Sequence, residues 1–156
     1  MLNDQSSGDL LSDSDIPYQQ ATTGQRFLNY FIDNLFMRFG LSFLTGALFG
    51  VVLQFISPAF LENIAVRGTF AFWFFIFTIG IFNYIVYYTL CEKLMNGYTL
   101  GKFITGTRAI RLDGNPLTFK DALLRSLSRI VPFEAFSGFG VPWHDSWTNT
   151  QVIKAR

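Results

Sequence analysis

Two long uncharged segments restrict the fold of this chain more than any other feature. Residues 39–61 and 68–91 contain no Asp, Glu, Lys or Arg. As helices that rise about 1.5 Å per residue, both are long enough to cross a bilayer core of about 30 Å. Only 15% of the residues are charged, whereas soluble domains carry about 25%. We therefore predict a mostly α-helical integral membrane protein with two transmembrane helices.

The sequence also indicates where these helices begin and end. Thr22 or Thr23 can cap a first helix, because a Thr hydroxyl accepts from free backbone N–H groups. The helix is predicted to run unbroken over residues 25–57, where Pro58 ends it. The second helix is predicted over residues 68–95. Residues 1–20 are rich in Ser, Asp and Gln, so we expect a disordered acidic tail there.

The charge distribution predicts the orientation in the membrane. Two crossings place both termini on the same side. Residues 92–156 hold nine Lys or Arg against five Asp or Glu, and cytoplasmic segments are enriched in Lys and Arg. We therefore expect both termini in the cytoplasm.

Two small elements are predicted on the cytoplasmic side. Residues 107–112 and 117–120 flank an Asp-Gly-Asn turn, which predicts a small β-hairpin. Residues 121–131 follow a helical period, with leucines on one side and Arg125 and Arg129 elsewhere. This pattern is typical of an amphipathic helix at the membrane interface, with its arginines on anionic lipid headgroups. Pro132 and Glu134 argue against a third crossing.

One face of the first helix is polar at its entrance. Arg26, Asn29 and Asp33 lie three and four residues apart, so they share a helix face. Charged groups within a membrane are costly and are functional by default. The three residues form either a buried polar site that could bind a cation or pass a proton, or a solvated collar among the headgroups.

Small residues mark another face of the same helix. Ser42, Gly46 and Gly50 recur every four residues, a spacing that lets helix backbones approach closely. They either pack against the second helix of the same chain or mediate self-association.

Several other activities find no support. The single His144 and its neighbour Asp145 do not supply the three or four ligands of a metal site. The glycines at 97 and 101 have the wrong spacing for a phosphate-binding loop, and no Ser or Cys stands in a nucleophile motif. A net charge of +1 does not indicate a nucleic-acid partner. We expect no enzyme activity, no cofactor and no metal.

The ordered set of motifs resembles the RDD family of small bacterial membrane proteins, named for one Arg and two Asp. Its first helix begins with an Arg and contains an Asp. A Gly-x-Thr-Leu-Gly-Lys segment, an Asp-Gly turn, an Ala-Leu-Leu-Arg helix and a His-Asp ending followed by Thr complete the pattern. The corresponding positions are Arg26, Asp33, residues 97–102, Asp113-Gly114, residues 122–125, His144-Asp145 and Thr150.

The resemblance covers residues 21–153, which we interpret as one RDD-like membrane domain with Asp145 as the second Asp. It implies a bacterial inner-membrane location and a role in transport, in some members of the sodium/proton exchange type. Many members have a longer third apolar segment, which here is interrupted by Pro132 and Glu134. A complete path within one protomer is therefore not expected.

Two functions follow as expectations. The first is cation/proton exchange or small-solute translocation by a homo-oligomer, with Asp33 as the carboxylate, Arg26 as its partner, and His144 and Asp145 on the cytoplasmic side. The second is a membrane adaptor or assembly subunit of a larger complex, without transport activity, in which the Arg and Asp residues hold helices together.

Overall fold

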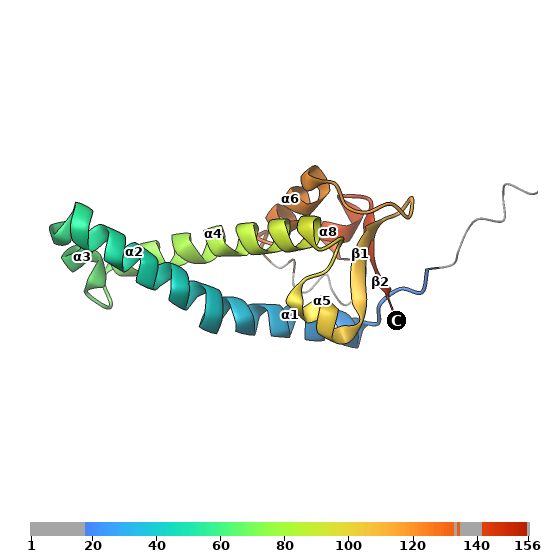
Figure 1. The fold of residues 1–156 in the computed structure, drawn as a ribbon, viewed down its shortest axis with the longest axis horizontal. Helices are drawn as coiled ribbons and strands as arrows, with labels where there is room; N and C mark the ends of the chain where they lie inside the picture. Colours follow the sequence, from blue (N-terminus) through green and yellow to red (C-terminus); the bar gives the residue numbers. More distant parts are fainter. Residues whose placement is uncertain (1–17, 133, 135–141, 156) are drawn as a thin grey trace, which may run out of the picture.

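The protein is a long helical hairpin with a small α/β cap at one end (Figure 1). The computed structural model describes residues 18–132, 134 and 142–155. Its elements in chain order are α1 (Thr23–Phe36), η1 (Met37–Leu41), α2 (Ser42–Ile56), α3 (Pro58–Ala65), α4 (Phe70–Leu94), α5 (Leu100–Thr105), β1 (Thr107–Arg111), α6 (Phe119–Ser128), α8 (Trp143–Ser146) and β2 (Thr150–Lys154).

The first arm of the hairpin is continuous, as predicted. Thr22 caps α1 in a capping box with Gln25, which satisfies donors that have no partner inside the helix. One π-helical turn, η1, joins α1 to α2. The whole arm, Thr23–Ile56, is one candidate membrane span. Ser57 leaves the helical conformation just before Pro58, and Pro58 then starts the short helix α3.

The second arm returns to the cap as one helix. Gly68 has a φ of +90°, which makes the turn that glycine tolerates best, and Thr69 caps α4. Phe70–Leu94 is the second candidate membrane span. The described N-terminal residues and the C-terminus lie at the same end of the hairpin (Figure 1), which agrees with the expected arrangement of the two arms.

The cap contains a two-stranded sheet, but not the predicted hairpin. β1 pairs antiparallel with β2, from Thr107 opposite Lys154 to Arg111 opposite Thr150. The Asp-Gly-Asn turn forms, with Gly114 donating to the carbonyl of Arg111. The second predicted strand was wrong, because Thr118 and Asp121 form a capping box that starts α6 instead.

The sheet also reaches the N-terminal segment. Ala21 donates to the carbonyl of Val152, Lys154 donates to that of Gln19, and Gln20 forms a bridge with Ile153. Chain pairing thus begins by Gln19, inside the region expected to be the tail. Residues 1–17 of that region lie outside the described residues.

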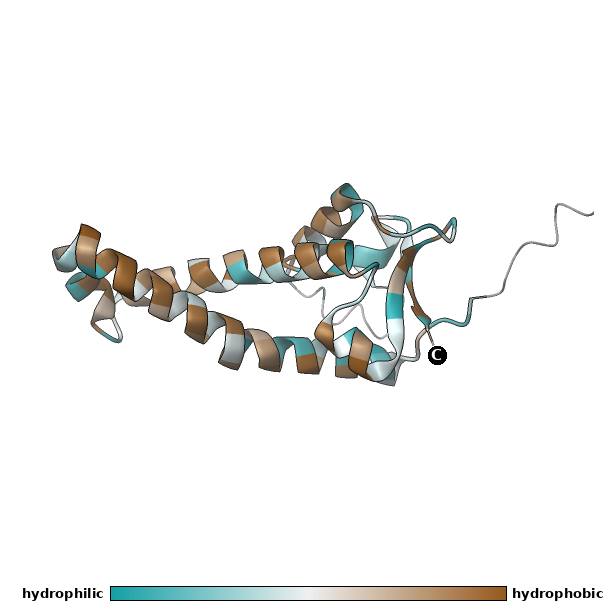
Figure 2. Ribbon diagram, in the orientation of Figure 1, coloured by the Kyte–Doolittle hydropathy of each residue, from teal (hydrophilic) through white to brown (hydrophobic). Residues whose placement is uncertain are grey.

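Hydrophobic residues predominate along the arms of the hairpin, and hydrophilic residues are more frequent in the cap (Figure 2). No residue of α2 is buried, and Phe43 and Phe55 are 72% and 84% exposed. Apolar exposure of this extent is suited to a lipid environment and not to water. Near the cap, Met37 packs with Tyr87 and Tyr88 in a small core between the two arms.

Candidate functional site

The side chain of Asp33 connects the first arm of the hairpin to the cap through hydrogen bonds. Its side chain is 1% exposed and accepts three hydrogen bonds. Tyr87 Oη and Thr99 Oγ1 donate at 2.7 Å, and the backbone N–H of Gly101 donates at 2.8 Å. Since Thr99 and Gly101 lie at the start of α5, the carboxylate joins α4 and α5 to α1. A buried carboxylate is tolerable only when hydrogen bonds replace its lost water.

The glycines before and within α5 allow this close approach. A Cβ on Gly101 would lie 2.4 Å from the carbonyl oxygen of Asn29, and one on Gly97 would lie 1.9 Å from that of Ala109. Gly97 also has a φ of +91°, in the region that favours glycine. The Gly-x-Thr-Leu-Gly-Lys motif is therefore a turn and helix start that fits against α1, as its failure as a phosphate loop suggested.

Arg26 pairs with Asp145 and not with Asp33. Its Nη1 lies 2.5 Å from Asp145 Oδ2, across 119 residues of sequence. The expected partnership of Arg26 with Asp33 was therefore wrong. Both carboxylates are buried. Asp33 accepts hydrogen bonds from neutral donors, whereas Asp145 forms ion pairs with arginines.

Arg125 is the centre of a buried chain of ion pairs. It is 0% exposed, with Nη1 2.6 Å from Asp145 Oδ1 and Nε 2.9 Å from Glu92 Oε2. Nη1 also contacts Thr150 Oγ1. The chain thus links α4, α6, α8 and β2, and Arg26 extends it to α1. Removing one partner from such a chain leaves an uncompensated buried charge.

Glu92 accepts from two more cations. Lys102 Nζ lies 2.6 Å from Glu92 Oε1, and Arg129 Nη2 lies 2.9 Å from the same oxygen. The Arg129 guanidinium also stacks 4.3 Å from the centre of the Tyr88 ring. Burial lowers the pKa of Lys102 to about 8, although Glu92 opposes this shift.

The structure therefore places Arg125 and Arg129 in buried ion pairs and not on an exposed face of the helix. The basic side of α6 faces α4, where Ser126 and Thr89 hydroxyls are 2.8 Å apart. The prediction of a helix at this position is confirmed, but its exposed basic face was wrong. The sequence signal was ambiguous because arginines on an amphipathic helix pair equally well with lipid phosphates or with buried carboxylates.

Asn29 completes the polar face of α1. It is 5% exposed; its Nδ2 donates to Thr107 Oγ1 at 2.9 Å, and its Oδ1 accepts from Thr105. Asn29, Asp33 and Arg26 are thus all engaged by the cap. Of the two interpretations left open for this face, the geometry matches the buried polar site.

His144 lies beside Asp145 and contacts Glu134. Nδ1 is hydrogen-bonded to Glu134 Oε1, and Nε2 lies 3.5 Å from Asp145 Oδ1. Burial, reinforced by Arg129, lowers the pKa of His144 to about 4, so the ring is neutral near pH 7. Burial would raise the pKa of Asp145, but Arg125, His144 and Arg26 outweigh it and hold that pKa well below its usual range.

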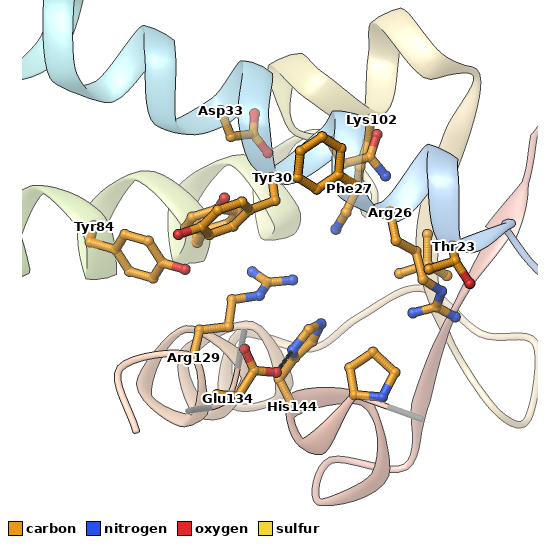
Figure 3. A pocket seen from close by; sticks show the side chains of 14 residues that line it. Thr23, Arg26, Phe27, Tyr30, Asp33, Tyr84, Lys102, Arg129, Glu134 and His144 are labelled. Carbon is orange, nitrogen blue, oxygen red and sulfur yellow. Dashed lines mark hydrogen bonds and ion pairs between the residues drawn. The ribbon is translucent and has the colours of Figure 1, made fainter. Parts of the chain in front are cut away.

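A pocket of about 260 Å³ opens beside this network, between the two arms and the cap. Aromatic side chains of α1 and α4 form much of its wall, including Phe27, Tyr30 and Tyr84. Figure 3 shows Arg129 reaching into this space from the α6 side, with Glu134 and His144 below it. Charged side chains of the cap, including Lys102, Arg129 and Glu134, line this pocket.

The sequence did not reveal every member of the site. Glu92, Lys102 and Glu134 were not among the predicted site residues, because a charge at the end of an apolar helix or in a loop is ordinary. Ser42, Gly46 and Gly50 lie away from the network, and nothing lies within 4 Å of a Cβ placed on either glycine. These two glycines therefore do not pack against α4.

Within residues 18–132, 134 and 142–155, no group of three or more His, Cys, Asp or Glu side chains is arranged to hold a metal ion. All four buried carboxylates of the site, those of Asp33, Glu92, Glu134 and Asp145, already accept from protein donors.

Two candidate spans that carry a polar α/β cap define a small hairpin membrane protein. A model of the RDD family matches residues 20–147, and the chain belongs to that family. A search of curated proteins found no match, and a search of solved structures also found none. The three residues expected from the sequence to be the family's Arg and two Asp, Arg26, Asp33 and Asp145, all lie at the junction of hairpin and cap.

Proposed function

We propose that this protein moves an ion or small solute across the bacterial inner membrane as an oligomer, with the cap in the cytoplasm. The observation that carries the proposal is the pocket between the two candidate spans, which brings ionisable side chains of four helices to one accessible space. Such a convergence of polar groups in a mostly apolar pocket is typical of a binding site. The proposal includes no catalytic role.

The geometry favours a solute over a bare cation. A cation/proton exchanger needs a carboxylate free to exchange ligands, and the carboxylates that line the pocket, Asp33 and Glu134, already accept hydrogen bonds within the protein. A solute can instead use the donors and aromatic rings of the wall. The His144–Glu134 pair is the group best suited to a proton-linked step, because it borders the pocket and its two ionisable side chains share a hydrogen bond.

An oligomer is required because two helices do not enclose a path. The exposed face around Gly46 and Gly50 supports self-association, since glycines with open space above them allow another helix to approach closely. The Lys and Arg excess after residue 92 supports a cytoplasmic cap.

Flux measurements test the proposal. Purified protein is reconstituted into proteoliposomes that contain a pH-sensitive dye, and sodium, potassium, phosphate or short carboxylate gradients are imposed in turn. We expect at least one gradient to drive proton movement in the wild type, and Glu134→Gln to slow it at least tenfold. Glu62→Gln, which removes an exposed carboxylate on α3, is the matched control and should not change the rate.

The second candidate is the adaptor or assembly subunit, favoured by the internal pairing of the site's buried carboxylates. In that case the wild type gives no flux with any gradient, and the protein co-purifies in fixed stoichiometry with a larger membrane complex. If Gly46→Leu weakens that complex and neither the wild type nor any variant gives flux, the transport proposal is wrong and the adaptor function is supported.

A further inference from the structure

Arg129 carries a hydrogen-bond donor that the protein itself does not use. Its side chain is 8% exposed, and Nη2 is bound to Glu92. Nη1 is shielded from solvent and has no hydrogen-bond partner in the structure. Buried donors of native proteins nearly always have an acceptor, so an unpaired guanidinium N–H beside a cavity indicates a missing acceptor.

The side chain that carries the unpaired donor lines the pocket. Arg129 lines it together with Tyr30, Tyr84 and His144, and Figure 3 shows its guanidinium group in the open space between Tyr30 and His144. Tyr84 directs its hydroxyl toward the same space (Figure 3). Arg125 also has an unpaired nitrogen, but it is enclosed in the ion-pair chain and does not line the pocket.

The unpaired donor in the wall favours an anion. Arg26, Lys102 and Arg129 line the pocket, against two carboxylates, Asp33 and Glu134. Both carboxylates already accept protein hydrogen bonds, and Arg26 and Lys102 are already paired with Asp145 and Glu92. The buried group of the wall that is left to bind an entering ligand is therefore a donor, Arg129 Nη1. Arg is the side chain best suited to carboxylate and phosphate, because its planar fork presents several N–H groups.

The rest of the wall is apolar and the space is small. Phe27, Tyr30, Tyr84 and Tyr88 surround it with rings. Its volume of about 260 Å³ is just below the roughly 300–1,000 Å³ of pockets for drug-sized ligands. A short alkyl or aryl group fits these walls better than a fully polar ion.

We propose that the pocket binds a small amphipathic anion, with a phosphate or carboxylate group on Arg129 and its apolar part against the rings of α1 and α4. The inference rests on the proposed function, because it names the class of solute that the transport pocket takes. The same anionic group could come from a water-soluble organic anion or from a phospholipid headgroup of the surrounding bilayer.

Binding to the intact protein tests this inference separately from flux. The protein in phosphatidylcholine nanodiscs is titrated calorimetrically with mono-n-butyl phosphate, and with butyltrimethylammonium as the oppositely charged probe of similar shape. We expect saturable binding of the phosphate only. Arg129→Gln should raise its Kd at least tenfold and Tyr84→Phe a few-fold, whereas Arg38→Gln, the same change at an exposed site on η1, should leave it unchanged.

A second arm distinguishes the source of the anion. In nanodiscs that contain equal phosphatidylglycerol and phosphatidylcholine, retention of phosphatidylglycerol in native mass spectra that is lost in Arg129→Gln identifies a lipid headgroup as the occupant. Butyl phosphate binding without such retention identifies a water-soluble anion.

The inference is overturned if the wild type binds neither anion, or if Tyr84→Phe and Arg129→Gln both bind butyl phosphate as the wild type does. Because Arg129 also pairs with Glu92, circular dichroism must show that Arg129→Gln is folded, and Tyr84→Phe provides the test if it is not. Binding without flux would contradict the proposed transport alone, whereas flux without anion binding would contradict only this inference.

Discussion

At the outer end of the hairpin, α2, α3 and the first half of α4 expose aromatic side chains, with Phe55 and Phe70 each 84% exposed. At the cap end, six charged residues are at most 7% exposed: Asp33, Glu92, Lys102, Arg125, Glu134 and Asp145. Lipid gives apolar helices no hydrophobic reason to associate, so polar contacts must fix the arrangement of a small membrane protein. The polar contacts that fix the arrangement of the helices therefore lie at the cap end. The apolar surface of the other end is free to contact lipid or another helix.

Among the substitutions considered, replacement of Arg125 at the cap end should lower the free energy of unfolding the most. In Arg125→Met, Glu92 and Asp145 lose the cation that they share, and we expect a loss of about 3–5 kcal/mol of folding free energy because both carboxylates stay buried. Unfolding of the purified protein can be followed by the reactivity of Cys91, a partly buried free thiol. Arg38→Met at an exposed position is the control; an equal unfolding temperature for both variants would show that the ion-pair chain is not structural.

Asp33→Asn should have the next largest effect. One carboxylate oxygen becomes an amide nitrogen, which cannot accept. Either Thr99, or Tyr87 and Gly101 together, then lose their acceptor, and a buried donor left unpaired costs about 1–3 kcal/mol. Hydrogen exchange should accelerate in α5 and much less in α2, whereas Glu62→Gln should change neither. Unaltered protection of α5 would mean that the carboxylate does not hold the cap on α1.

The cap should also be the acid-sensitive end. The pKa of His144 is about 4 in the folded protein and about 6.5 when unfolded, so the unfolded chain binds more protons between these values. Folding stability should therefore fall as the pH falls from 6.5 to 4, by at most about 3 kcal/mol. Charged groups that face the ring are Glu134, Asp145, Arg125 and Arg129.

Thermal unfolding at several pH values checks this prediction. His144→Gln removes the titrating ring and should flatten the dependence over this pH range. Below pH 4, loss of the ionised form of Asp145, whose pKa is lowered by Arg125 and Arg26 as well as by His144, should still destabilise the variant. If the stability of His144→Gln falls between pH 6.5 and 4 as steeply as that of the wild type, groups other than His144 cause the pH dependence.

The smallest effect on folding is expected at the outer end. Gly46→Leu and Gly50→Leu add side chains where nothing lies within 4 Å, so the free energy of unfolding should change by less than about 0.5 kcal/mol. Self-association, measured by cross-linking in membranes, should nevertheless fall. Ala47→Leu at a neighbouring exposed position is the control, and an equal drop there would remove the glycine face from the oligomer interface.

Sequence reasoning found the parts of this fold that depend on local chemistry. The helix start at Thr22, its end before Pro58 and the turn at Gly114 follow from caps and backbone preferences of neighbouring residues. The pairing of β1 with β2 was missed because Thr150–Lys154 is a short strand far along the chain. Arg26 and Asp33 stood out in an apolar setting, but their partners were set by tertiary contacts that no spacing reveals.

We propose that both arms cross the membrane with the cap in the cytoplasm, and labelling of the two ends of the hairpin tests this most directly. In a Cys91→Ser background, Asn63→Cys on α3 and Asp113→Cys in the cap turn place single thiols at exposed positions of the two ends. A membrane-impermeant maleimide should label position 63 only in right-side-out vesicles and position 113 only in inside-out vesicles. Labelling of both positions from the same side would contradict the account.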